Sequence, residues 1–407
     1  MVFQHSTGWS WDFNVYSLNA QYLFHNGVYM EWLRPPLVPV ILGFLQYVFP
    51  VKASEYVFIV LSSILFAYSV EKLSRTYGLK QEAFYILAFS PFVIFYANFN
   101  GTELLYLGFL TLFLTDFKSP RSGLWMGLAF LTRYTAFILI PLSLLQRDIR
   151  KTFKTLLTAF LTVLPWFIYN HIALGHPFAS LSSNYALNAA ERGLATAFDP
   201  LHIFLITAFS IPLALLYVKD LKLESEDYLM FAVSALIIFR QFATQVKELR
   251  YVIDLAVPAA FLGAKGLEKL EIDQRKILLV LTGVYLIGFG VLMVNYPLED
   301  PGIYMEASNE VGDCQAVSDE WVHLSYAGTP SGPLRFQSAE EFKDEGYKVV
   351  NFSQGSYTVE GSECIERPYN TSYVESIGQL YGREIRYCEY LPVETCEVEE
   401  MFGRPFR

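Results

Sequence analysis

The chain has 407 residues, of which 53% are hydrophobic and 17% are charged, and its mean hydropathy is +0.31. This composition is too apolar and too poor in charge for an ordinary soluble domain. Apolar runs of about 15 to 20 residues recur between residues 55 and 295, and each is close to the length that crosses a hydrocarbon core of about 30 Å. The sequence therefore predicts a multi-pass membrane protein.

The net charge of −10 is divided unevenly along the chain. Residues 296–407 hold 21 acidic and 8 basic residues, which leaves 19 acidic and 22 basic residues in the first 295. So acidic a tail argues against a nucleic-acid partner, because phosphate contacts need clustered Lys and Arg. All four cysteines lie in this tail, which suggests two disulfides in an oxidising compartment; their pairing and the alternative of four free thiols stay open. They are Cys314, Cys364, Cys388 and Cys396.

The first predicted region, residues 1–54, is an outer loop that contains a peripheral helix. Asp12 lies there between aromatic residues, and partial burial at headgroup depth would raise its pKa toward that of a general base. The alternative is a solvated aspartate beside an aromatic belt. Pro35 and Pro36 can begin a helix but cannot lie inside one. Residues 37–49 are therefore predicted to form a short helix at the membrane interface.

The second predicted region, residues 55–295, contains about ten spanning helices. They are expected near residues 55–72, 82–99, 103–117, 122–134, 135–146, 154–173, 201–218, 227–245, 251–265 and 277–295. Of the 22 basic residues in this part of the chain, 15 fall in five alternate loops, which the positive-inside tendency places in the cytoplasm. The amino-terminal loop and the tail then face outward. Because an outward amino terminus without a preceding span is unusual, we expect one further helix before this chain, an unassisted outward terminus being the alternative.

Five charged residues in or beside the predicted spans are candidates for a site. Glu103 begins a span, where its alternative role is that of a first-turn acid stabilised by the helix dipole. Arg133 and Arg240 interrupt apolar runs, where a charge usually faces a cavity or a partner, snorkelling being the alternative. Lys247 and Arg250 lie at the outer mouth of a span, where they would suit an anionic lipid phosphate because guanidinium binds phosphate through two parallel hydrogen bonds. Pairing with a neighbouring glutamate or with lipid headgroups is the alternative there.

Several common catalytic motifs do not occur in the sequence. The six histidines form no close metal-ligand pair on a helix face, so no zinc site is predicted. The sequence also has no P-loop, no GxSxG elbow and no dinucleotide fingerprint, and ATP-driven transport and serine hydrolysis therefore lack their usual motifs.

Eight short motifs in order over residues 12–258 resemble the GT-C superfamily of membrane glycosyltransferases. The resemblance is to the protein O-mannosyltransferase and aminoarabinose transferase branch and its archaeal relatives. The motifs are Asp12, Arg34-Pro35-Pro36-Leu37, Ser90-Pro91-Phe92, the stretch from Asn98 to Glu103, the stretch from Gly127 to Ala136, Leu164-Pro165-Trp166, Gly175-His176-Pro177-Phe178 and Arg250-Tyr251. The resemblance implies an all-α polytopic bundle of some eleven helices with an outward catalytic cavity, ten of them in this chain.

The resemblance also implies a role for each candidate residue. Asp12 would be the general base that deprotonates the acceptor hydroxyl, and Glu103 would be a second acid. Arg133 and Arg250 would hold the carrier phosphate, with Lys247 as a neighbour. The expected reaction is inverting transfer of a glycosyl group from a polyprenyl (dolichyl) phosphate-linked sugar to a protein, lipid or glycan acceptor outside the membrane. Because the cations could replace a metal and the first loop has no Asp-x-Asp pair, we expect no cofactor and no obligatory divalent ion.

The third predicted region, residues 296–407, is a small α/β extracytoplasmic domain. Residues 315–317 and 347–352 are strand-like, and residues 338–342 suggest a helix.

Two other functions remain open for the whole chain. A transporter or lipid flippase would also use charges inside the membrane, although transporters commonly show two related halves and no internal repeat is found here. A non-catalytic scaffold on the same fold would tolerate the loss of Asp12.

Overall fold

The computed structural model describes most of the chain. The described residues are 5, 8–25, 27, 30–99, 101–146, 148–186, 200–218, 223–243, 249–270, 273–295, 300–334, 338–353, 355–362 and 364. Their contacts divide the chain into two compact units. Unit 1 comprises residues 59–165 and 192–297, and unit 2 comprises residues 2–58, 166–191 and 298–407.

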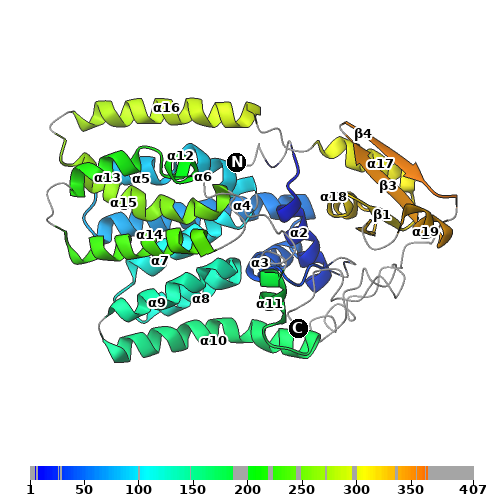
Figure 1. Cartoon of the computed structure of the whole chain (residues 1–407), viewed down its shortest axis with the longest axis horizontal. Coiled ribbons are helices and arrows are strands. Elements are labelled where there is room, and N and C mark those ends of the chain that lie inside the picture. The colour runs from blue at the N-terminus through cyan, green and yellow to red at the C-terminus, as the bar shows by residue number, and fades with distance from the viewer. Residues whose placement is uncertain are drawn as a thin grey trace. The chain divides into compact units, whose positions relative to one another are not determined.

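Unit 1 is built from helices (Figure 1). In chain order they are α4 (Val51–Thr76), α5 (Gln81–Ala88), α6 (Pro91–Phe99), α7 (Glu103–Thr115), α8 (Arg121–Thr132), η1 (Tyr134–Ile138), α9 (Leu139–Leu142), η2 (Ser143–Gln146), α10 (Ile149–Leu174), α12 (Pro200–Thr207), α13 (Ser210–Val218), α14 (Ser225–Ala243), η4 (Leu249–Leu255), α15 (Ala256–Leu267) and α16 (Gln274–Asn295). The beginning of α4 and the end of α10 belong to unit 2. Each predicted span coincides with one helix or with consecutive helical segments.

Two of the predicted spans are broken. The span expected at 82–99 divides into α5 and α6 at Ser90, because Pro91 cannot continue a helix and restricts the residue before it. The Ser90 hydroxyl donates to the carbonyl oxygen of Ile206 at 2.9 Å, which satisfies one polar group at the break. The span expected at 201–218 divides into α12 and α13 beside Ala208, whose φ is 45°.

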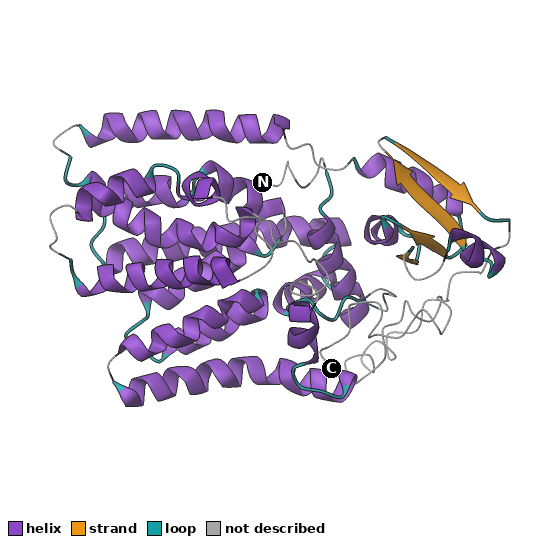
Figure 2. Ribbon diagram, in the orientation of Figure 1, coloured by secondary structure: helices purple, strands orange, loops and turns teal. Residues whose placement is uncertain are grey.

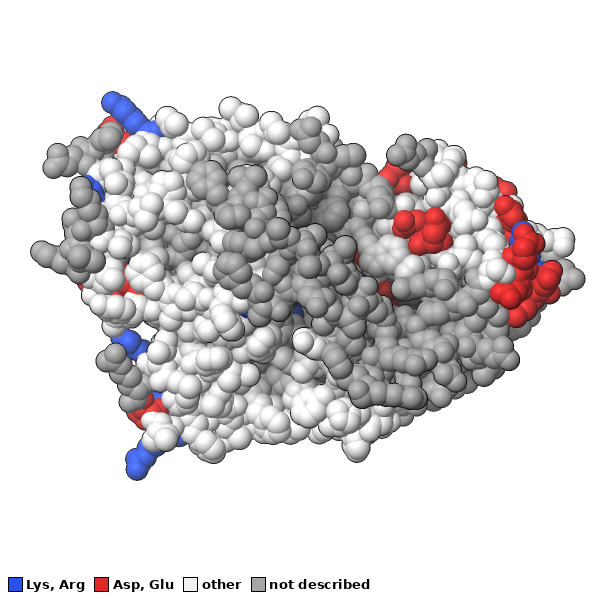
Figure 3. All heavy atoms as spheres, viewed as in Figure 1, with Lys and Arg blue, Asp and Glu red and all other residues white. Residues whose placement is uncertain are grey.

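Three described helices, α4, α10 and α16, are long and apolar enough to cross a membrane. Large apolar side chains on α16 point outward; Leu279, for example, is 73% exposed. The described surface along the helices shows few charged side chains, and Lys and Arg appear near the beginnings of α10 and α16 (Figure 3). These features support a membrane location. The number of crossings stays a prediction.

Helices α13 and α15 approach closely through glycine, as helices in membranes often do. A Cβ atom added at Gly266 would overlap the carbonyl oxygen of Leu213. We expect Gly266→Ala to lower the free energy of unfolding by about 1–3 kcal/mol through overpacking, measured as a lower Tm of the detergent-solubilised protein. Gly290→Ala in α16 is the control, because a Cβ there meets nothing within 4 Å. Equal losses in both variants would contradict the packing explanation.

Unit 2 combines helices with a sheet, and the described strands lie in its carboxy-terminal part (Figure 2). Its elements are α2 (Trp11–Phe24), α3 (Leu37–Gln46), α11 (Ala179–Ala186), α17 (Pro301–Val311), β1 (Ala316–Ser318), α18 (Trp321–Ala327), β2 (Ser331–Pro333), α19 (Ala339–Asp344), β3 (Lys348–Ser353) and β4 (Ser356–Glu360). The strand order is β2-β1-β3-β4. Strand β1 is parallel to β2 and β3, and β3 is antiparallel to β4.

The small α/β fold expected after the spans is therefore present. Strands β1 and β3 each lie within one residue of their predicted positions, and α19 begins with a capping box formed by Ser338 and Glu341. A disulfide joins Cys314 to Cys364. Cys388 and Cys396 lie outside the described residues. The predicted division into residues 1–54, 55–295 and 296–407 stays a prediction.

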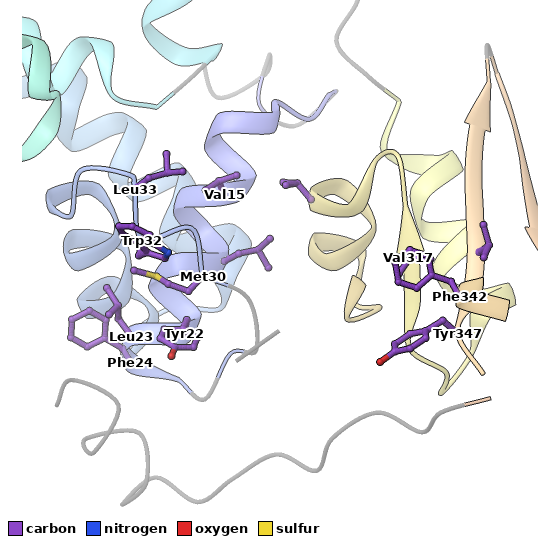
Figure 4. Close-up of a cluster of buried hydrophobic side chains, with 13 residues drawn as sticks. Val15, Tyr22, Leu23, Phe24, Met30, Trp32, Leu33, Val317, Phe342 and Tyr347 are labelled. Carbon is purple, nitrogen blue, oxygen red and sulfur yellow. The ribbon is translucent and has the colours of Figure 1, made fainter. Parts of the chain in front are cut away.

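One hydrophobic cluster of unit 2 draws side chains from the amino-terminal and the carboxy-terminal parts of the chain. Figure 4 shows Val15 and Tyr22 on α2, and Val317 and Phe342 from the α/β part. Burial of such side chains is worth roughly 1.5–3 kcal/mol each. The cluster therefore ties the helix that carries Asp12 to the α/β part.

Helix α3 is the peripheral helix expected over residues 37–49. It ends at Gln46, and the apolar side chains of Phe44 and Val48 remain exposed at this end. Its place at the membrane interface stays a prediction.

Candidate functional site

Asp12 lies in the first turn of α2 and is paired with Arg34. Asp12 Oδ1 is 2.8 Å from Arg34 Nη1, and Arg34 Nε is 2.9 Å from Glu31 Oε2. The backbone of Glu31 is fixed in turn by the side chain of Asn19, which accepts from its N–H at 2.8 Å and donates to its carbonyl oxygen at 3.0 Å. The loop before α3 is thus held against α2, and a cation is held against the candidate base.

The charges around Arg34 decide its own protonation state. Burial opposes the charged guanidinium, but the carboxylates of Asp12 and Glu31 outweigh it and raise the pKa of Arg34 well above its ordinary value. Arg34 therefore stays positive, and a positive neighbour favours the ionised form of a carboxylate. The aromatic neighbours of Asp12 were evident from the sequence, and the structure adds this ion pair. An ionised carboxylate is the form that can accept a proton.

Helix α18 of the α/β part packs against the first turns of α2. The Trp11 ring meets the Trp321 ring edge-on at 4.6 Å between centroids, and Asn14 Nδ2 is 2.9 Å from His323 Nδ1. The aromatic surroundings of Asp12 thus come partly from residues about 300 positions away. No local signal in the sequence marks that contact.

A further buried carboxylate of unit 2, Glu55, was not among the predicted site residues. Its oxygens accept hydrogen bonds from Ser17 Oγ at 2.7 Å and from the Tyr326 hydroxyl at 2.5 Å, and they lie 2.9 Å from His5 Nε2 and 3.4 Å from Lys52 Nζ. Glu55 is fully buried. It binds α2 and α18 to the beginning of α4. An acid within the first apolar span was the available signal, since such a charge usually has partners.

In unit 1, Glu103 and Arg133 form a buried ion pair. Arg133 Nη1 is 2.5 Å from Glu103 Oε1, and the backbone N–H and the hydroxyl of Thr102 donate to the other carboxylate oxygen at 3.1 and 3.2 Å. Glu103 is 1% exposed. Arg133 follows the last residue of α8 in extended backbone, before η1 begins. The expected junction of two short helices at Arg133 is confirmed, and Arg133 pairs with a partner there.

Arg133 and Arg250 meet at the ring of Tyr251. The Cζ atoms of the two arginines lie 5.9 and 5.3 Å from its centroid, which is the range of cation–π attraction. Arg133 also lies 5.9 Å from the ring of Tyr106. Two cations that are 117 positions apart in the sequence thus share one aromatic ring. Lys247 lies outside the described residues.

Behind this ring, Asp254 and Arg240 form a second buried pair. Asp254 Oδ2 accepts from Arg240 Nη1 at 2.7 Å and from the Tyr106 hydroxyl at 3.0 Å, and Arg240 Nη2 donates to the carbonyl oxygen of Tyr251. Arg240 is 5% exposed, so the snorkelling alternative is wrong for it: its head lies inside the protein against an acid. Asp254 was not among the predicted site residues, although an acid in an apolar run was the available signal.

The structure thus brings four candidate residues together in unit 1, Glu103, Arg133, Arg240 and Arg250. Asp12 belongs to unit 2, and its convergence with the arginines stays a prediction. Among the described residues, no group of three or more His, Cys, Asp or Glu side chains could hold a metal ion.

Comparisons with known proteins agree with this fold. A family model described as Glycosyltransferase family 87 matches residues 32–198. The structure of ArnT from Cupriavidus metallidurans in the apo state is similar, with a TM-score of 0.65 and 13% identity over 86% of this chain and 90% of that chain. The structure of the same protein bound to undecaprenyl phosphate is similar with a TM-score of 0.55 and 15% identity over 76% of this chain. No curated protein sequence matches the chain significantly.

The chain spans 63% of the length of the undecaprenyl-phosphate-bound ArnT chain that it matches. At 13–15% sequence identity, the similarity to the ArnT structures shows that the fold is shared. The predicted resemblance to the GT-C membrane glycosyltransferases is confirmed at the level of the fold, and the family model over residues 32–198 supports it.

Proposed function

We propose that this chain transfers a glycosyl group, with inversion, from a polyprenyl-phosphate-linked sugar to an acceptor on the outer side of the membrane. The observation that carries the proposal is the pair of guanidinium groups, Arg133 and Arg250, at the Tyr251 ring. They lie in a fold similar to that of a protein whose structure is known with undecaprenyl phosphate bound. Guanidinium groups suit a phosphate because their planar donors match its oxygens.

The proposed reaction is a single displacement. The acceptor hydroxyl gives its proton to the carboxylate of Asp12, and its oxygen attacks the anomeric carbon of the sugar. The bond from that carbon to the phosphate oxygen breaks, and its electron pair stays on the phosphate. Arg133 and Arg250 stabilise the negative charge that grows on the departing polyprenyl phosphate. One displacement at the anomeric carbon inverts its configuration.

Transfer by the purified full-length chain tests this proposal. The protein in detergent is incubated with radiolabelled dolichyl-phosphate sugars and membrane acceptors, and the label in the acceptor and the anomeric configuration of the product are measured. Inverted product from at least one donor is expected. Absence of transfer with every donor, together with flux of the labelled lipid across liposomes, would support the transporter or flippase instead.

The proposal assigns charge stabilisation to the arginines and includes no obligatory divalent ion. We therefore expect that dialysis against EDTA changes the transfer rate by less than about twofold, because fixed guanidinium charges remain in place. The rate is measured before dialysis, after it, and after addition of Mg²⁺ or Mn²⁺. A loss that either ion restores would assign the charge-stabilising role to a metal.

A further inference from the structure

The 3₁₀ helix η4 carries the residues at which the two guanidinium groups meet. Arg250 and Tyr251 lie near its beginning, and Asp254 lies three residues after Tyr251. Side chains three residues apart eclipse one another in a 3₁₀ helix, and runs longer than three or four residues are uncommon because their hydrogen bonds are poorly aligned. A seven-residue 3₁₀ helix therefore needs support from outside itself.

Arg240 on α14 supplies that support at two points one turn apart. Its Nη1 donates to the Asp254 carboxylate at 2.7 Å, and its Nη2 donates to the carbonyl oxygen of Tyr251. The planar guanidinium fork can hold two acceptors in a fixed relation, which a lysine ammonium cannot do. Arg240 thus fixes the backbone of η4 at Tyr251 and the side chain at Asp254.

Tyr106 connects the hydrogen bonds between Arg240 and η4 to the Glu103–Arg133 pair. Its hydroxyl donates to Asp254 at 3.0 Å, and its ring lies 5.9 Å from Arg133. Glu103 and Tyr106 are three residues apart on α7, so one face of that helix serves both pairs. A buried ion pair by itself is weak evidence for stability, and its better-attested use is to specify one arrangement.

Resting on the proposed function, we infer that Arg240 and Asp254 are positioning residues for the donor phosphate. They hold η4 so that the Tyr251 ring stays within cation–π distance of both Arg133 and Arg250, and they do so without touching the substrate. Donor affinity then depends on a side chain of α14 that reaches the site only through η4.

The test uses Arg240→Lys, which keeps the charge and removes the fork, and Tyr106→Phe, which removes one hydroxyl and no charge. Lys265→Gln is the matched control. It breaks a similarly buried ion pair, since Lys265 and Asp227 are 2.9 Å apart with side chains 10% and 0% exposed, and Lys265 also pairs with Glu224 and Glu226. That pair lies about 15 Å further along α15 at 1.5 Å per residue.

Two readouts are taken on each variant of the full chain in detergent. Hydrogen exchange of the η4 amides needs no substrate, and Arg240→Lys is expected to raise it by about tenfold or more, the effect of losing one strong hydrogen bond. Steady-state transfer from a dolichyl-phosphate sugar is expected to show a donor KM raised by about tenfold with the acceptor KM unchanged, as loss of uniform binding predicts. Tyr106→Phe should show the same pattern more weakly, and Lys265→Gln should show neither change.

The possible outcomes separate this inference from the function on which it rests. Unchanged exchange in η4 with a raised donor KM would overturn the inference, because Arg240 would then act on the donor directly. An equal rise in η4 exchange in Lys265→Gln would overturn it as well, since the loosening would be general. A third outcome is that η4 exchange rises in Arg240→Lys alone, while the wild-type protein transfers sugar from no donor. This outcome would support the role of Arg240 in holding η4 and would contradict the proposed function.

Discussion

Replacing Asp12 with asparagine is expected to lower the transfer rate by about 10²- to 10⁴-fold, the usual contribution of a positioned general base. Asparagine has nearly the same shape but cannot accept the proton of the acceptor hydroxyl. Arg34 keeps Glu31 as a partner in this variant, 2.9 Å away, so no buried charge is left alone. The measurement is kcat/KM for labelled dolichyl-phosphate sugar, together with donor binding, which should persist.

The neighbouring carboxylate provides the control for this prediction. Glu31 also pairs with Arg34, and it lies closer to full burial than Asp12. Glu31→Gln should therefore reduce transfer by less than about tenfold, because it removes one charged hydrogen bond and no proton acceptor. Equal losses in Glu31→Gln and Asp12→Asn would show that the ion pair with Arg34 is what matters. Transfer unaffected by Asp12→Asn would reject the assignment of the base.

Replacing Arg133 with glutamine is expected to cost stability and donor binding together. The carboxylate of Glu103, 1% exposed, would lose its cation, and an uncompensated buried charge costs about 3–5 kcal/mol. The same change removes one of the two guanidinium groups proposed to hold the carrier phosphate. Thermal unfolding in detergent and binding of dolichyl phosphate measure the two losses separately.

The double variant Glu103→Gln/Arg133→Gln separates the structural role of the pair from its proposed role in the site. A neutral pair of amides restores most of the stability, because no charge is buried alone. Donor binding and transfer should not return with it. Recovery of transfer in the double variant would mean that the pair only supports the fold. Lys265→Gln serves again as a control for the cost of opening a buried pair.

Much of the helical framework follows from local sequence. Apolar runs predicted the position of α16 to within three residues at its start, and Pro91 accounts for the break between α5 and α6. Local patterns also predicted β1, β3 and α19. The break beside Ala208 also has a local signal, because Pro212 lies in the first turn of α13 and its ring would clash with the carbonyl group of residue 208 in a continuous helix. How many helices cross the membrane depends on tilt and packing, which length and hydropathy do not specify.

The site was predicted in its charged residues but not in their partners. Arg133 and Glu103 were both expected in the site, and they are in contact across 30 positions of sequence. Arg34 was expected only as part of a motif, and its pairing with Asp12 was not foreseen. Asp254 was not predicted, because cations at the outer mouth of a span do not by themselves indicate which acid balances them.

From its sequence alone, this protein is determined to be a membrane chain with a weakly basic helical part and an acidic α/β tail, because composition, hydropathy and charge are local properties. Only the tertiary structure decides which charges meet. A buried charge must find a counter-charge or a hydrogen-bond partner, but several acids are available to every arginine. The packing of α7 against α8 selects Glu103 for Arg133, and the packing of α14 against η4 selects Asp254 for Arg240. That choice depends on the shapes of side chains far apart in the sequence.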